Sequence, residues 1–209
     1  MQIKRFDEEK WIYPFIMRCP EKMKENLPII IQLHGAGERG NGKDELLRVE
    51  VHGFSHVLTE DVEYDCILVQ PQCKTGSFWA ADVQSIIKFI NQVVDEFKAD
   101  RNRIYLAGIS MGAFGTWYTA MAKPDMFAAI APCCGGGMPW NANVLKMPIW
   151  AFHGDKDDTV NVRESIEMVE NARRENDDVN LTIYENVGHD SWNLAFSVEL
   201  LEWLLSKHK

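Results

Sequence analysis

One serine stands in a setting that favours nucleophilic chemistry. The segment Gly108-Ile109-Ser110-Met111-Gly112 follows an apolar, strand-like run and precedes a helical pattern. Glycines on both sides of a serine allow a tight strand–turn–helix bend that exposes its hydroxyl, which is the G-x-S-x-G arrangement of serine nucleophiles. The alternative is a serine that only caps a helix after a glycine turn, so the assignment of Ser110 depends on finding its partners.

A serine hydroxyl attacks a carbonyl only when a base removes its proton, and the base needs an acid to orient it. In this arrangement the chain order is serine, acid, histidine, which leaves His189 and His208 as candidate bases. His208 is the penultimate residue of a lysine-flanked tail, whereas His189 follows the last predicted strand and opens the last predicted helix. We therefore predict that His189 is the base, against the alternative of a surface-loop histidine. The histidines excluded by this order are His34, His52, His56 and His153.

Three aspartates compete for the role of the acid. Asp155, Asp157 and Asp158 follow the apolar run that ends at Gly154. Asp155 comes directly after the glycine and is expected to shape the turn, while Asp158 directly precedes a helical pattern and is expected to cap it. We therefore predict Asp157 as the acid, and Asp155 and Asp158 as solvated loop charges.

Strand-like and helical patterns alternate along the chain, which is typical of an α/β fold. The strand-like runs are nearly continuous in apolar residues, as expected for strands buried on both faces of a mostly parallel sheet. In such a sheet, chemistry is expected in the loops that leave the carboxyl ends of the strands. The runs cover residues 11–17, 28–34, 65–70, 103–108, 127–133, 147–153 and 179–185, and the helical patterns cover 80–98, 111–122, 162–174 and 192–206.

The whole chain, 1–209, is expected to form a single domain, because 209 residues exceed one typical domain only slightly. Its net charge of −9 disfavours nucleic acid and anionic membranes as partners. We expect neither a signal peptide nor a membrane span, because no suitable apolar run occurs. The five cysteines are odd in number and form no CxxC motif, which favours a cytoplasmic protein without a disulfide framework or zinc site. The sequence leaves the oligomeric state open.

These motifs resemble those of small serine esterases of the α/β-hydrolase superfamily. The segment 33–40, Leu-His-Gly-Ala-Gly-Glu-Arg-Gly, is similar to the signature of the group that contains predicted peptidases, feruloyl and carbohydrate esterases and polyhydroxybutyrate-depolymerase-like enzymes. The stretch 153–160 matches the acid loop of the group, which supports Asp157. The group commonly has proline where this chain has Asn161, a difference that affects only the helix entry. The resemblance implies an α/β-hydrolase fold with a mostly parallel central sheet and helices on both faces.

An oxyanion hole is expected from two backbone amides, because acyl transfer develops a negative charge on the carbonyl oxygen. The group places these donors at the residue after the nucleophile and in the loop after the first parallel strand, here Met111 and Ala36. The Met111 amide also belongs to the first turn of a helix, where N–H groups lack intrahelical partners. A plain tight turn is the alternative for the glycine-rich loop. Glu38 and Arg39 are expected to form an ion pair that holds this loop.

Three tryptophans are predicted to line the substrate site. Trp79, Trp140 and Trp192 occupy separate loops that we place on the catalytic side of the sheet, where a flat or apolar group could stack on them. Core packing is the alternative for each one. The twelve residues 135–146 are too few for a helical cap, so we expect no cap domain and an open cleft.

Together these residues predict a cofactor-free and metal-free serine hydrolase that acts on small, aryl or carbohydrate-linked carboxylic esters. A peptidase or thioesterase with the same triad is the second hypothesis, because the triad specifies acyl transfer and not the leaving group. A non-catalytic binding protein with the hydrolase fold is the third, and the intact triad argues against it.

Overall fold

The computed structural model describes residues 1–209, and its centre is an eight-stranded sheet in the order β1-β2-β4-β3-β5-β6-β7-β8. Six neighbouring strands from β4 to β8 run parallel, and β2 pairs antiparallel with both β4 and β1. The strands are β1 (Gln2–Phe6), β2 (Phe15–Cys19), β3 (Ile29–Leu33), β4 (Ile67–Pro71), β5 (Ile104–Ile109), β6 (Ala129–Cys133), β7 (Ile149–Gly154) and β8 (Val179–Tyr184).

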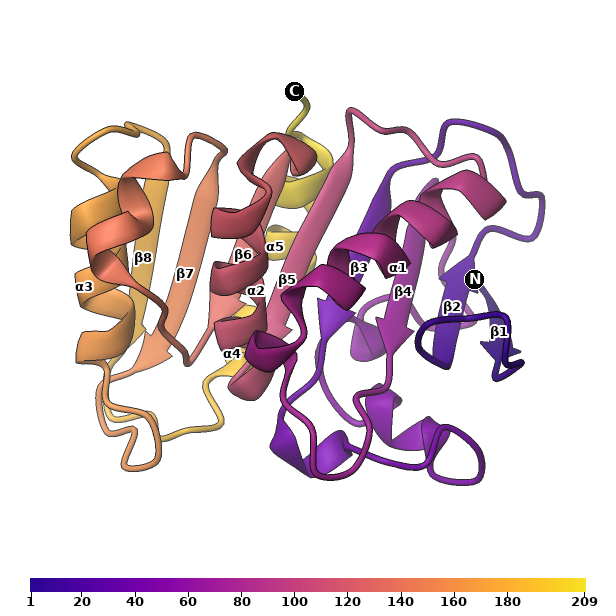
Figure 1. Ribbon diagram of the computed structural model, residues 1–209, viewed down its shortest axis with the longest axis horizontal. Coiled ribbons are helices and arrows are strands. Elements are labelled where there is room, and N and C mark those ends of the chain that lie inside the picture. Colours follow the sequence, from indigo (N-terminus) through magenta and orange to yellow (C-terminus); the bar gives the residue numbers. More distant parts are fainter.

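Helices cover both faces of the sheet, which confirms the predicted α/β-hydrolase architecture (Figure 1). Helices α1, α2 and α3 lie on one face, and α4 and α5 lie on the other. Two large apolar cores result, one on each side of the sheet. The strands β2 to β6 are buried along their whole length, which explains their nearly continuous apolar sequence. The helices are α1 (Val83–Glu96), α2 (Met111–Ala122), α3 (Arg163–Ala172), α4 (Trp192–Ala195) and α5 (Val198–Leu205).

The two ends of the chain differ from the sequence-based prediction. β1 was not predicted, because its residues are largely polar and partly exposed at the edge of the sheet. The predicted helix over 192–206 is broken in two, since Ser197 has an extended backbone and its side chain accepts a hydrogen bond from the Leu200 amide. The break separates the segment next to His189 from the helix that packs on the sheet.

The segment between β6 and β7 forms no helical cap, as expected from its length. It contains a single 3-10 helix, Pro139–Val144, which packs mainly against α3. The carboxyl ends of β5, β7 and β8 therefore remain accessible for a site. None of the helices combines the length and the apolar character that crossing a lipid bilayer requires.

Candidate active site

Ser110 occupies a strained turn between β5 and α2. Its backbone has φ 53° and ψ −114°, a conformation that residues with a side chain rarely adopt. The turn is possible because the flanking glycines leave room for close backbone contacts. A Cβ on Gly108 would lie 2.1 Å from the Gly112 carbonyl oxygen, and a Cβ on Gly112 would lie 2.0 Å from the Leu33 carbonyl oxygen. Both predicted glycine positions thus have a steric cause.

The structure brings Ser110, His189 and Asp157 together in one hydrogen-bonded chain. Ser110 Oγ lies 2.9 Å from His189 Nε2, and His189 Nδ1 lies 2.7 Å from Asp157 Oδ2. These residues come from the turn after β5, the loop after β8 and the loop after β7, and all three turns lie at the carboxyl edge of the parallel strands. The arrangement can withdraw a proton from the serine hydroxyl and stabilise the resulting imidazolium.

The environment of Asp157 favours its ionised form. Its side chain is fully buried, and Oδ1 accepts hydrogen bonds from the amides of Thr159 and Val160 at 2.9 and 2.8 Å. Burial opposes the charged carboxylate, but the hydrogen bonds from His189 and from these two amides outweigh it and lower the pKa of Asp157 below its ordinary value. The other two aspartates face different partners: Asp155 accepts a hydrogen bond from the Asn186 amide, and Asp158 from the Thr159 hydroxyl.

A second histidine, which sequence reasoning excluded as the base, contacts the same carboxylate. His153 is fully buried, and its Nε2 lies 3.1 Å from Asp157 Oδ2 and 2.9 Å from the Val160 carbonyl oxygen. Its Nδ1 lies 2.8 Å from Ser165 Oγ, which also contacts the Gly135 carbonyl oxygen. Because both neighbours of Nε2 are acceptors, this nitrogen carries a proton directed at the acid loop.

The two predicted oxyanion donors flank the serine. Ala36 and Met111 line the same hollow as Ser110, and neither of their amides donates to a protein acceptor. His34 fixes the loop that carries Ala36: its Nδ1 donates to the Gly35 carbonyl oxygen at 2.5 Å, and its Nε2 accepts from the Cys73 amide at 2.9 Å. Burial lowers the pKa of His34 to about 4, so this imidazole is neutral.

Trp79 is a core residue and not a substrate contact, which corrects the prediction. Its side chain is fully buried, its Nε1 donates to the His34 carbonyl oxygen at 3.0 Å, and Tyr13 packs against it edge-on. The absence of a side chain at Gly115 lets α2 pack onto it, since a Cβ there would lie 2.5 Å from Trp79 Cβ. Trp79 therefore supports the oxyanion loop from the core.

Trp140 also lies outside the candidate site. The side chain is exposed and borders a surface groove together with Asn171 of α3 and Arg174 in the turn after it. The prediction failed because Trp140 lies in the 3-10 helix Pro139–Val144. This helix packs beside α3, away from the carboxyl ends of the strands that carry the candidate triad. Trp192, by contrast, lines a hollow with Ser110 and His189, and its ring contacts the His189 ring edge-on, with centroids 5.2 Å apart.

The expected ion pair between Glu38 and Arg39 is not formed. Arg39 donates to the carbonyl oxygens of Ala36 and Ser77, and its guanidinium lies over the Phe78 ring. Glu38 turns the other way, into the cleft beside Ser110. The two side chains diverge because Arg39 donates to the backbone of the loop, so Arg39 helps to hold the loop without an ion pair to Glu38.

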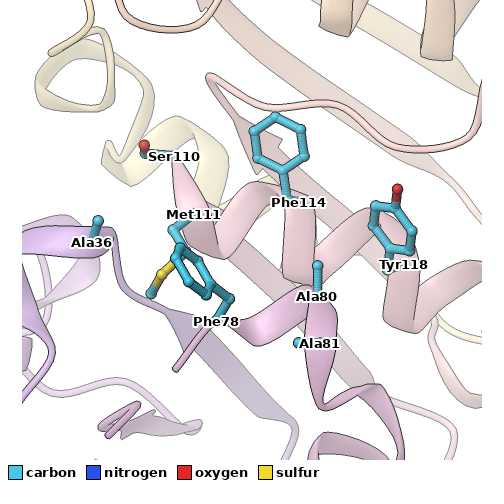
Figure 2. Close-up of a pocket in the computed structure, with 8 residues that line it drawn as sticks. All are labelled: Ala36, Phe78, Ala80, Ala81, Ser110, Met111, Phe114 and Tyr118. Atoms are coloured by element: carbon cyan, nitrogen blue, oxygen red, sulfur yellow. The ribbon is translucent and has the colours of Figure 1, made fainter. Parts of the chain in front are cut away.

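An apolar hollow of about 610 Å³ opens on one side of Ser110. Figure 2 shows Phe114 and Tyr118 projecting from successive turns of α2, with Phe78 and Ala80 on the neighbouring segment. Sequence reasoning missed these residues, although a signal was present: Ser110, Phe114 and Tyr118 are spaced by four and therefore share one face of a helix. This hollow can accept an apolar or aromatic group next to the nucleophile.

One group of potential metal ligands occurs here, and it overlaps the hydrogen-bonded chain. Ligand atoms of Cys134, Asp157 and His189 lie within 4.8 Å of one another. The pair His189 Nδ1 and Asp157 Oδ2 is already joined by a hydrogen bond, and the Cys134 thiol donates to the His189 carbonyl oxygen at 3.3 Å. The donor atoms thus serve the acid–base pair. The neighbouring Cys133 is buried, and burial raises the pKa of its thiol well above the ordinary value.

The chain resembles a known protein family and individual relatives in sequence. Residues 65–202 match the phospholipase/carboxylesterase family. The chain is 28% identical over 161 residues to the bifunctional acetylxylan esterase/xylanase XynS20E of Neocallimastix patriciarum, and 29% identical over 150 residues to poly(3-hydroxyalkanoate) depolymerase C of Paucimonas lemoignei. These matches cover 74% and 65% of this chain but 23% and 34% of the two relatives, so the chain spans about a quarter to a third of their length.

Solved structures share this architecture over 90% to 100% of the chain. A thermostable esterase superposes with a TM-score of 0.81 at 28% identity, covering 100% of this chain and 63% of the esterase. An acetyl xylan esterase from Aspergillus awamori has a TM-score of 0.69 at 15% identity, with 90% of this chain and 94% of that one covered, and shares the fold.

Proposed function

The chain belongs to the phospholipase/carboxylesterase family of α/β-hydrolases, and from this premise we propose that it is a serine esterase that hydrolyses carboxylic esters through a covalent acyl-enzyme. The observation that carries the proposal is the hydrogen-bonded chain from Ser110 through His189 to the buried Asp157. The family alone supports a hydrolase of the esterase type. The roles of the individual residues and the choice of substrate are our proposal.

In the first half of the reaction, Ser110 Oγ attacks the carbonyl carbon of the ester while His189 Nε2 takes the hydroxyl proton. Asp157 holds the imidazole in place and stabilises its positive charge. The amides of Ala36 and Met111 donate to the carbonyl oxygen as it becomes negative. When the tetrahedral intermediate collapses, the bond to the leaving alcohol breaks and His189 returns its proton to the alcohol oxygen.

In the second half, water replaces the alcohol. His189 takes a proton from the water as its oxygen attacks the acyl carbon, and the same two amides stabilise the second oxyanion. Collapse of this intermediate returns the proton to Ser110 Oγ and releases the carboxylic acid. The strained turn at Ser110 supports this cycle, because it holds Oγ at the mouth of the apolar hollow without any rearrangement of α2.

The proposed substrates are esters of small or aryl acids, including esters linked to carbohydrates. The apolar hollow next to Ser110 supports an acyl group of modest size that is at least partly aromatic or aliphatic. Several relatives carry names consistent with this range, namely acetylxylan esterase, feruloyl esterase B and poly(3-hydroxyalkanoate) depolymerase C. The uncapped cleft supports an ester at the end of a bulky carrier.

The proposal is tested with p-nitrophenyl acetate and an alkyl fluorophosphonate probe. We expect wild-type protein to hydrolyse the ester and to be labelled by the probe on Ser110, and Ser110→Ala to lose both. Ser165→Ala is not a suitable control because Ser165 contacts His153, so Ser206→Ala, which changes a serine at the end of α5, serves instead. Absence of turnover by the wild type, or undiminished turnover by Ser110→Ala, would refute the proposal.

A second candidate function is hydrolysis of amides or thioesters with the same residues. The observation that favours it is structural: an acylaminoacyl peptidase of Pyrococcus horikoshii shares this fold, with a TM-score of 0.65. Comparing kcat/KM for an ester, a thioester and an anilide that carry the same acyl group distinguishes the two functions. Preference for the anilide or thioester over the matched ester would replace the proposed esterase.

A further inference from the structure

Glu38 carries a carboxylate that lacks a partner within the protein. Its side chain is only 14% exposed, and no donor of the chain lies within hydrogen-bonding distance. The nearest basic atoms are His34 Nδ1 and His52 Nε2, both 3.9 Å away. His34 already donates from Nδ1 to the Gly35 carbonyl oxygen, and Arg39 points to other acceptors. The carboxylate oxygens reach the solvent and are therefore free to accept hydrogen bonds from a molecule that enters the cleft.

The carboxylate faces a second hollow beside the serine, which adjoins the apolar one at Ala36 and Ser110. This hollow, of about 260 Å³, is lined by polar and aromatic groups that include Ser110, His189, Glu38, His52, Thr159 and Trp192. Glu38 therefore sits in the wall of the same space that the reacting groups open into. The apolar hollow shares Ser110 with it but has seven hydrophobic residues among its eight.

The chemistry of the leaving group decides which part of an ester occupies which hollow. His189 must protonate the oxygen of the departing alcohol, so this alcohol lies on the His189 side of Ser110. His189 lines the hollow that contains Glu38 and does not line the apolar hollow. The acyl group then enters the apolar hollow, and the alcohol faces Glu38, His52 and Trp192.

The wall around the alcohol contains both acceptors and donors. Glu38 is an acceptor, the Thr159 hydroxyl can act in either way, and the His52 ring offers a donor and an acceptor nitrogen. The Trp192 ring lies next to His52, with centroids 5.3 Å apart, and adds an apolar surface. A site for an ammonium group would hold acceptors and aromatic faces only. A mixed wall fits hydroxyl groups, which both donate and accept.

We infer that Glu38 is a specificity-determining residue that accepts hydrogen bonds from the hydroxyl groups of a polyhydroxylated leaving alcohol. The inference rests on the proposed esterase function and extends it, because it assigns the polar hollow to the alcohol and names the residue that recognises it. Glu38 takes no part in proton transfer, so its loss lowers the rate only for alcohols that carry these hydroxyls.

The test uses three esters that share the butyryl group and differ in the alcohol: glucose 6-butyrate, cyclohexylmethyl butyrate and butyrylcholine. The first two present a six-membered ring on a primary alcohol with and without hydroxyls, and the third presents a quaternary ammonium. The kcat/KM of each is measured for wild type, Glu38→Ala and Glu38→Gln. Glu170→Gln on the exposed face of α3 is the matched control for the loss of one negative charge.

We expect Glu38→Ala to lower kcat/KM for glucose 6-butyrate by about 10-fold or more, the size of a lost hydrogen bond to a charged group, and to change cyclohexylmethyl butyrate by less than about 2-fold. Glu38→Gln keeps an acceptor and is expected to lose less, and it provides the comparison if Glu38→Ala does not fold. An equal loss on both ring esters, or a loss confined to butyrylcholine, would overturn the inference. The esterase function would still stand in that case if the wild type hydrolyses p-nitrophenyl acetate. Absence of p-nitrophenyl acetate turnover by the wild type refutes the esterase function, and the inference with it.

Discussion

His153 Nε2 lies 3.1 Å from Asp157 Oδ2, on the same carboxylate oxygen that His189 contacts at 2.7 Å. The acid of the candidate triad is thus held between two imidazole rings, one facing the cleft and one fully buried. His153 Nε2 donates to the Val160 carbonyl oxygen at 2.9 Å, and the Val160 amide donates to Asp157 Oδ1, so this imidazole holds the loop that presents the carboxylate to His189. His153 therefore has the position of a residue that acts on the reaction through Asp157.

Two substitutions of His153 separate this positioning role from core packing. In His153→Gln the side-chain amide can donate from near the Nε2 position, whereas the shorter His153→Asn reaches only the Nδ1 position beside Ser165. We expect His153→Asn to lower kcat by about 10-fold or more and to move the acidic limb of the pH–rate profile to lower pH, because a less firmly held Asp157 carboxylate stabilises the imidazolium form of the base less. The measurement is kcat and kcat/KM for p-nitrophenyl acetate across the pH range.

His153→Gln is expected to regain part of the rate and to keep the acidic limb near that of the wild type. Thermal unfolding of both variants provides the control. If the two variants lose equal stability and both retain the wild-type pH profile, His153 is a packing residue only.

The candidate triad could be predicted from the sequence because each member follows a recognisable strand. The order of serine, acid and histidine, together with the strand and helix patterns, was enough to choose His189 over His208 and Asp157 over its two neighbours. The fold followed from the same patterns, apart from the polar edge strand β1 and the break of the last helix at Ser197. These features are local or depend on chain order alone.

Features that depend on tertiary packing could not be predicted from the sequence in the same way. Trp79 and Trp192 both occupy loops near the catalytic edge, yet one is buried under α2 and the other lines the cleft. The difference depends on Gly115, whose missing side chain admits the Trp79 ring, and on the direction of each loop. The contact between His153 and Asp157 likewise depends on a turn that brings residues four apart together outside any helix.

The assignment of Asp157 as the acid of the candidate triad, in preference to Asp155 and Asp158, can be tested by substitution. Asp157→Asn should lower kcat by about 10³-fold to 10⁴-fold, because an amide cannot stabilise the imidazolium and favours the wrong tautomer of His189. Asp158→Asn should change kcat by less than about 2-fold, since Asp158 contacts only the exposed Thr159 hydroxyl. Steady-state kinetics with p-nitrophenyl acetate compares the two variants. Comparable losses in both variants would contradict the assignment of the acid.

The apolar hollow is expected to set the acceptable length of the acyl group. Ala80 is half-buried in its wall, and Ala80→Phe would place a ring in the space between Phe78 and Tyr118. We expect kcat/KM for p-nitrophenyl octanoate to fall by about 10-fold, while p-nitrophenyl acetate, which does not reach the blocked space, changes by less than about 2-fold. If both esters lose activity in the same ratio, the acyl group does not occupy this hollow.

Stability should depend on pH through His34. Its folded-state pKa is about 4, below the ordinary value of 6.5, so as the pH falls through this window the unfolded chain binds the proton first and unfolding is favoured. We expect this group to reduce the free energy of unfolding by about 2 to 3 kcal/mol between about pH 7 and about pH 4.5. Urea unfolding measures the effect.

The non-titrating variant His34→Gln should show a smaller loss over this pH window than the wild type, although it begins from a lower stability because it lacks part of the hydrogen bonding to Gly35 and Cys73. His208→Asn removes an exposed histidine and should keep the wild-type pH dependence. An identical slope in His34→Gln and the wild type would assign the pH dependence to other groups.

Substitution by alanine should destabilise the protein at Gly112 and leave its stability almost unchanged at Gly37. A Cβ at Gly112 would lie 2.0 Å from the Leu33 carbonyl oxygen, so Gly112→Ala must push α2 away from β3, and we expect a loss of more than about 2 kcal/mol of stability together with a loss of activity. Gly37 has no atom within 4 Å of the same position, so Gly37→Ala should fold with stability within about 0.5 kcal/mol of the wild type. Thermal and urea unfolding compare the two. A stable and active Gly112→Ala would show that the turn at Ser110 does not depend on close packing of the backbone against β3.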